Sequence, residues 1–122
     1  MNKSEYLEDI QNRMTYDKSM PGDGWTDLII ECHRKLIILD PEYRILQIKE
    51  KFGSLRYYFD TDVKEPAVKE AMYRYVKYAE NSSKIVCEKC GGASEIKRTK
   101  TGWLKAYCNE CSVGQEFERV EV

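Results

Sequence analysis

The sequence predicts an α+β protein in which helices pack on a β-hairpin and a small four-cysteine zinc lobe follows. Three observations lead to this prediction: stretches with helical apolar periodicity, a glycine-containing hairpin pattern between them, and two Cys-x2-Cys pairs near the C-terminus. With 42% hydrophobic and 34% charged residues, the composition is that of an ordinary globular protein. We expect an α+β core over residues 1–83 and a zinc lobe over residues 84–122, docked on the third helix.

Three helices are expected. The first covers residues 5–14 with Ser4 as its cap, and the third begins between Asp62 and Pro66 and ends near residue 81. The second, over residues 24–39, has the clearest pattern, because its apolar residues recur at i, i+3, i+4, i+7 and i+11. These residues are Trp25, Leu28, Ile29, Cys32 and Leu36.

The segment YRILQIKEKFGSLRYYFD, residues 43–60, predicts a β-hairpin. Gly53 and Ser54 suit a two-residue type II′ turn, which would place Phe52 opposite Leu55. Because side chains alternate along a strand, one face of the hairpin is then mostly apolar and the other is polar and largely cationic.

The cysteines follow the pattern C-x2-C-x17-C-x2-C. Two such pairs can supply the four corners of a tetrahedral zinc site, so we expect one structural Zn²⁺ bound by Cys87, Cys90, Cys108 and Cys111. Two disulfides or a thiol-redox site are the alternatives. The lobe is expected to be of treble-clef or zinc-ribbon type. The stretch SVGQEFERV, residues 112–120, favours the treble clef if it forms a helix.

No catalytic motif is visible, and we expect no catalytic residues and a non-enzymatic protein. Cys32 lies on an apolar helical stripe and is expected in the core, whereas His33, the only histidine, is expected exposed or partly buried. The N-terminal sequence lacks the apolar core of a signal peptide, and no apolar run is long enough to cross a membrane. These features favour the bacterial cytoplasm, where thiols stay reduced.

Two surfaces are candidates for binding. The cationic hairpin face is expected to bind a protein partner and consists of Gln47, Lys49, Lys51, Arg56 and Tyr58. The basic part of the zinc lobe interleaves cations with aromatic residues, as single-strand-binding surfaces do. It offers a nucleic-acid-binding alternative through Lys97, Arg98, Lys100, Trp103 and Lys105. The net charge of −1 gives no overall attraction to nucleic acid.

With GDGWTDLIIECHRKL, LDPEYRILQIKEKFGSLRYYF and CEKCG…GWLKAYCNEC in view, the chain resembles an uncharacterised family of small bacterial and bacteriophage proteins. That family has a Gly-Trp-led helix, a QIKEKFG-x-LR hairpin and a C-terminal cysteine-rich zinc lobe. The resemblance covers residues 22–111. It implies a bacterial or phage origin and no mechanism. The expected function is therefore a zinc-containing interaction protein that binds and modulates a protein partner, with nucleic-acid binding as the alternative.

Overall fold

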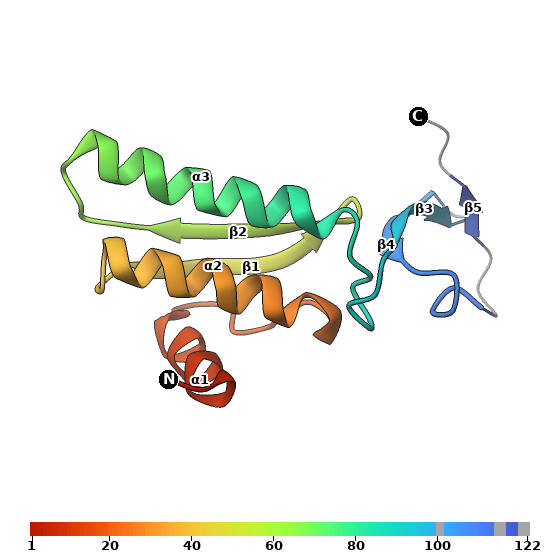
Figure 1. Cartoon of the computed structure of the whole chain (residues 1–122), viewed down its shortest axis with the longest axis horizontal. Coiled ribbons are helices and arrows are strands. Elements are labelled where there is room, and N and C mark those ends of the chain that lie inside the picture. The colour runs from red at the N-terminus through yellow and green to blue at the C-terminus, as the bar shows by residue number, and fades with distance from the viewer. Residues whose placement is uncertain (100–101, 114–116, 120–122) are drawn as a thin grey trace.

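The computed structural model describes residues 1–99, 102–113 and 117–119, and it confirms the α+β prediction. A two-stranded hairpin lies beside two long helices, a third helix packs against one of these, and a small three-stranded sheet lies beyond the hairpin tip (Figure 1). Among the described residues, no helix is long and apolar enough to cross a membrane. The elements are α1 (Lys3–Arg13), the 3₁₀ turn η1 (Asp23–Trp25), α2 (Thr26–Leu39), β1 (Arg44–Lys51), β2 (Ser54–Asp60), α3 (Pro66–Ser83), β3 (Glu95–Thr99), β4 (Leu104–Tyr107) and β5 (Phe117–Arg119).

The first helix begins earlier than predicted. The side chain of Asn2 accepts a hydrogen bond from the backbone N–H of Glu5 at 2.9 Å, and the Glu5 carboxylate accepts one from the N–H of Asn2 at 3.2 Å. This reciprocal capping box satisfies two N–H groups of the first turn, so Asn2 is the cap and Ser4 lies inside the helix. Pro66 stands at the first position of α3, as expected.

The apolar stripe of the second helix is confirmed as part of the core. Trp25, Ile29, Cys32 and Leu36 are buried, and Leu28 packs against them partly exposed. The same hydrophobic cluster includes residues of all three helices and both hairpin strands, and it extends into the C-terminal lobe through Ala106. The C-terminal lobe therefore contributes the side chain of Ala106 to the main hydrophobic core.

The hairpin exists, but its predicted turn and register were wrong. Lys51 pairs with Ser54, so the two turn residues are Phe52 and Gly53. Both have positive φ, 56° and 82°, which is the signature of a type I′ turn, and this turn type matches the right-handed twist of the flanking strands. Because the register differs from the prediction by two residues, and side chains alternate with period two, the predicted apolar and cationic faces are retained except for Phe52, which leaves the apolar face for the turn and is exposed.

The third helix covers the outer edge of β2. Backbone N–H groups of Leu55 and Tyr57 point away from β1 and donate to side chains of α3, Ser83 Oγ at 2.7 Å and Glu80 Oε2 at 3.0 Å. At these two positions of the β2 edge, the backbone N–H groups that β1 does not pair are thereby hydrogen-bonded to α3.

The C-terminal lobe is held against the segment before α2. The carbonyl of Glu88 accepts the N–H of Gly24 at 2.7 Å, its carboxylate accepts the N–H of Gly22 at 2.9 Å, and Trp25 Nε1 donates to the carbonyl of Val86 at 2.8 Å. A Cβ on Gly24 would lie 2.0 Å from the carbonyl oxygen of Cys87. The two backbones thus approach more closely than any residue but glycine permits.

The lobe also meets the hairpin tip. A Cβ on Gly53 would lie 3.2 Å from the side chain of Ile96, and Lys105 Nζ lies 3.2 Å from Glu50 Oε2. The lobe therefore contacts the rest of the chain at two places, the Gly22–Trp25 segment and the hairpin tip. The domain boundary between residues 83 and 84 stays a prediction.

Replacing Gly24 by alanine should destabilise the protein by about 1–3 kcal/mol, because the added methyl group forces the two backbones apart. A urea titration of the metal-loaded chain measures this. Gly92→Ala is the matched control, since its Cβ would meet only Cys90 Sγ at 3.4 Å, an ordinary contact. Equal stability of the Gly24 and Gly92 variants would contradict the close approach.

Candidate metal centre

The first Cys-x2-Cys pair lies in a tight turn that follows α3. The N–H of Cys87 donates to the carbonyl of Gly92 at 2.7 Å, and the N–H of Gly91 donates to the carbonyl of Cys87 at 2.9 Å. Gly91 has a φ of 80°, which glycine adopts without strain. The turn thus brings the N–H of Gly92 to within 3.4 Å of Cys90 Sγ, a contact that favours the thiolate.

The second pair lies in the turn after β4 and repeats this design. The N–H of Cys111 is 3.4 Å from Cys108 Sγ, and the N–H of Ser112 donates to the carbonyl of Cys108 at 3.0 Å. Lys97 is almost fully buried and donates to Asn109 Oδ1 at 2.8 Å and to Ser112 Oγ at 3.0 Å. Its ammonium group therefore ties β3 to this turn.

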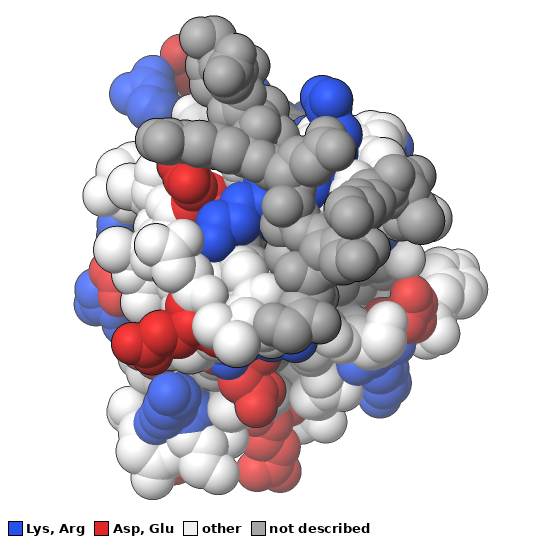
Figure 2. All heavy atoms as spheres, turned by 90° about the vertical axis from the view of Figure 1, so that its right-hand side faces the viewer, with Lys and Arg blue, Asp and Glu red and all other residues white. Residues whose placement is uncertain are grey.

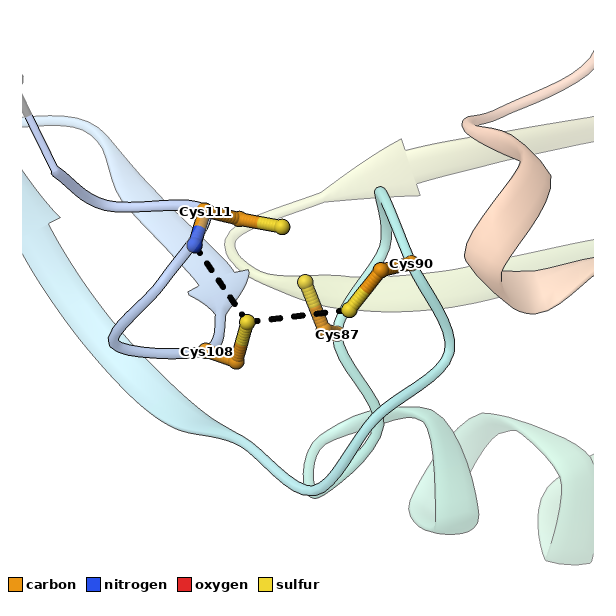
Figure 3. A group of neighbouring side chains, drawn as sticks. All are labelled: Cys87, Cys90, Cys108 and Cys111. Atoms are coloured by element: carbon orange, nitrogen blue, oxygen red, sulfur yellow. Dashed lines mark hydrogen bonds between the residues drawn. The ribbon is translucent and has the colours of Figure 1, made fainter.

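The strand pair β3–β4 brings the two turns together. Their strands are antiparallel, and Glu95 lies opposite Tyr107, so the turns that precede β3 and follow β4 meet at one end of the sheet. The four sulfur atoms converge on one space (Figure 3) and lie within 4.8 Å of one another, with Cys90 and Cys108 at 3.6 Å. Tetrahedral coordination at about 2.3 Å per sulfur would need separations of about 3.8 Å. The four predicted cysteines can therefore hold a metal ion.

The surroundings of the sulfurs shift their pKa values in opposite directions. Desolvation raises the pKa of Cys87, but the N–H groups of Cys108, Cys90 and Lys89 outweigh it and lower that pKa to about 6. Bonding to the Cys108 thiol raises the pKa of Cys111 to about 12. The Gly92 N–H lowers the pKa of Cys90, but the thiols of Cys108 and Cys87 raise it overall. A cluster of thiols at this spacing holds protons that a cation would displace.

The described residues that follow the second cysteine pair form turn and strand. Residues 109–113, which begin inside the second pair, form turns, and residues 117–119 form β5, which pairs antiparallel with β3. The order of the small sheet is β4-β3-β5. Of the segment 112–120, for which a helix would have indicated a treble clef, the described residues are turn and strand, while 114–116 and 120 lie outside the described residues.

The strand register places the residues of the cationic hairpin face on one side of the hairpin, and several of their side chains have intramolecular contacts. Gln47 donates to Asp17 at 2.9 Å, Arg56 lies 4.0 Å from Glu80, and Lys49 lies 6.0 Å from the centroid of the Tyr58 ring. Lys51 is exposed at the hairpin tip, 5.5 Å from the Phe52 ring centroid. Of this face, Lys49 and Lys51 line a cleft that they share with Trp103 and Leu104 of the lobe.

The second predicted surface is divided by the fold. Arg98 and Trp103 are exposed, whereas Lys97 is buried and Lys105 is paired with Glu50. Lys100 lies outside the described residues. The sequence analysis did not identify Phe52 as a surface residue that lines a cleft together with Trp103. The signal that could have identified it is a bulky aromatic residue directly before the turn glycine Gly53.

His33 was expected to be exposed or partly buried, and this was wrong. It is fully buried and connects two hydrogen-bonding groups, with Nε2 donating to Asp9 at 2.7 Å and Nδ1 accepting from the hydroxyl of Tyr43 at 2.5 Å. Tyr43 is bonded in turn to the hydroxyl of Tyr57 at 2.7 Å. Desolvation lowers the pKa of His33, so the ring is neutral in this chain of bonds, which satisfies polar groups inside the core. Cys32 is buried, as predicted, and desolvation raises its pKa to about 12, which leaves it an unreactive thiol.

Comparison of the chain with models of protein families, with curated proteins and with solved structures returned no match. The interpretation of the site therefore rests on its geometry.

Replacing Cys108 by serine should abolish stoichiometric metal binding and lower the free energy of unfolding of the lobe, because the metal is bound by the folded state. Elemental analysis and a thermal melt with and without chelator measure both effects. Cys32→Ser is the matched control: it alters a buried thiol outside the cluster, so metal content should stay unchanged. Equal metal content in the Cys108 variant and the wild type would exclude the site.

Metal retention should fall as the pH is lowered, because the ion binds thiolates and protons compete for them. Without a metal ion the pKa values of Cys90 and Cys111 are raised and that of Cys87 is about 6, so the ion displaces protons from Cys90 and Cys111 at neutral pH and must displace one from Cys87 as well below about pH 6. Full metal content at neutral pH and loss below about pH 6 are expected by elemental analysis after dialysis. Content that stays constant down to about pH 4, where carboxylates titrate, would contradict thiolate ligation.

Proposed function

We propose that the chain is a non-enzymatic interaction protein whose C-terminal lobe is held by one structural zinc ion. The four-cysteine cluster carries this proposal. Thiolates at tetrahedral spacing suit zinc, and four protein ligands leave no coordination position for water or substrate. The cysteines would then supply structure, and the binding surfaces elsewhere would supply function.

The lead function is the binding and modulation of a protein partner. A groove of about 630 Å³ lies between β2 and α3, and apolar side chains dominate its surface. Leu46, Tyr58 and Tyr73 line it and are all exposed, and the Phe59 ring lies 4.9 Å from the Tyr73 ring between centroids, with the two planes tilted by 45°. Aromatic anchors with a charged rim are typical of protein interfaces. The rim residues are Glu70, Arg74, Lys77 and Glu80.

The groove adjoins the cationic hairpin face, since Tyr58 belongs to both. A β-bulge between Ile45 and Gln47 gives Leu46 its exposed position at the groove. A partner with apolar residues and acidic neighbours would engage both surfaces together. The family resemblance adds a bacterial or phage setting to this proposal, in which the partner is a bacterial cytoplasmic protein.

Nucleic-acid binding is the second candidate function. It is favoured by the fold's placement of Lys49 and Lys51 beside Trp103 of the lobe. Against a large electrostatic contribution, Figure 2 shows acidic and basic side chains interspersed over the described part of the lobe end. Contacts to unstacked bases would have to supply much of the affinity.

The protein-partner proposal is tested by affinity capture from a bacterial lysate with the tagged, zinc-loaded chain, followed by binding measurements on the captured protein. Tyr73→Asp should weaken binding by about 30-fold or more, as expected for an interface anchor. Tyr78→Asp is the matched control, because Tyr78 is also an exposed tyrosine of α3 and does not line the groove. Equal effects of the two substitutions would contradict a partner in the groove.

A further inference from the structure

Two aromatic side chains from distant parts of the chain lie exposed at one cleft. Phe52 at the hairpin tip is 62% exposed, and Trp103, just before β4, is 67% exposed. Both line a cleft of about 260 Å³ between the hairpin tip and the small sheet. Large apolar rings left in water beside a cleft are typical of a binding surface.

The position of these rings is fixed by the docking of the lobe. Gly53 packs on Ile96, and Glu50 is paired with Lys105, so the hairpin tip cannot move away from β3 and β4 without losing both contacts. The cleft therefore combines the two surfaces that the sequence suggested separately.

Phe52 occupies a backbone conformation that aromatic residues rarely adopt. Its φ of 56° lies in the left-handed region, and the corresponding turn position favours asparagine, aspartate or glycine. Burial does not compensate for this strain, because most of the ring is in solvent. Strain that folding does not require is often retained for function.

The cleft is also cationic. Lys49 and Lys51 line it, while the one carboxylate among its lining residues, Glu50, is neutralised by Lys105. Arg98 lies opposite Leu104 in the strand register, and Leu104 lines the cleft too. Lysine beside an aromatic ring suits a ligand that carries both flat rings and anionic groups.

We propose that the Phe52–Trp103 cleft binds single-stranded nucleic acid, with bases stacked on the two rings and phosphates on Lys49 and Lys51. Single strands offer unstacked bases at regular spacing along an anionic backbone, which this arrangement complements, whereas a duplex hides its base faces. The inference rests on the second of the proposed functions and is independent of a protein partner in the groove at Tyr73.

The test uses the full, zinc-loaded chain and short oligothymidylate and oligouridylate at low salt. The chain has two tryptophans, and Trp25 is fully buried, so quenching of the exposed Trp103 reports on the cleft. Saturable quenching is expected. Anisotropy of a labelled strand then gives the affinity of each variant, and duplex DNA and polyglutamate serve as competitors.

Phe52→Asn and Trp103→Leu should each weaken binding by about 5- to 150-fold, the loss expected for one stacked base. Tyr78→Asn, which removes an exposed tyrosine outside the cleft, should leave affinity unchanged. Asparagine favours positive φ, so Phe52→Asn should melt no lower than the wild type and separate loss of binding from loss of folding. Lys51→Gln should reduce the slope of log affinity against log salt by about 0.7.

Binding that both cleft substitutions leave intact would overturn the cleft and keep nucleic-acid binding as a function. Absence of binding by the wild type at low salt would overturn both. Equal competition by duplex DNA would overturn the single-strand assignment, and equal competition by polyglutamate would show instead that the cleft accepts acidic protein segments.

Discussion

The close contact between the first cysteine turn and the Gly22–Trp25 segment is the constraint on which the rest of the structure depends. Glu88 sits at its centre. Its carbonyl and carboxylate accept hydrogen bonds from the two glycines, and its own N–H donates to the carbonyl of Ala106 in β4 at 2.8 Å. One residue between two sulfur ligands thus joins the metal centre to the start of α2 and to the small sheet.

In this arrangement the candidate metal centre has a structural role, and the proposed binding surfaces lie elsewhere on the protein. A metal ion bound by a closed set of four thiolates would be a structural element, and it would stabilise a lobe that has little apolar core of its own. Its effect is carried outward, because the placement of the lobe brings Trp103 to Phe52 and the hairpin tip to β3. A metal ion held by the four cysteines would therefore help to fix the geometry of the proposed binding surfaces without being one of their lining groups.

Much of the fold follows from local patterns in the sequence. Helical periodicity identified the stripe from Trp25 to Leu36, and the two Cys-x2-Cys pairs identified the four candidate metal ligands. Each of these signals consists of residues that are only a few positions apart in the sequence. The period of two preserved the hairpin faces even where the register was wrong. The type I′ turn was missed because phenylalanine is disfavoured at its first position, and a strained residue contradicts the local preference that predictions use.

Features that depend on contacts between distant residues were out of reach. The burial of His33 depends on Asp9 and Tyr43, which cap both ring nitrogens. The close approach of Gly24 depends on Cys87, more than half the chain away. The cleft depends on the docking of two hairpins whose sequences carry no sign that they meet.

The account is tested most directly by amide hydrogen exchange of the zinc-loaded chain before and after chelation. Removing the metal should accelerate exchange in residues 86–99 and 102–113 and at the N–H of Gly24, whose acceptor is the Glu88 carbonyl, while the core amides of α2 and α3 stay protected. Unchanged protection of the lobe and of Gly24 after complete metal removal would contradict the claim that a metal ion holds this lobe in place.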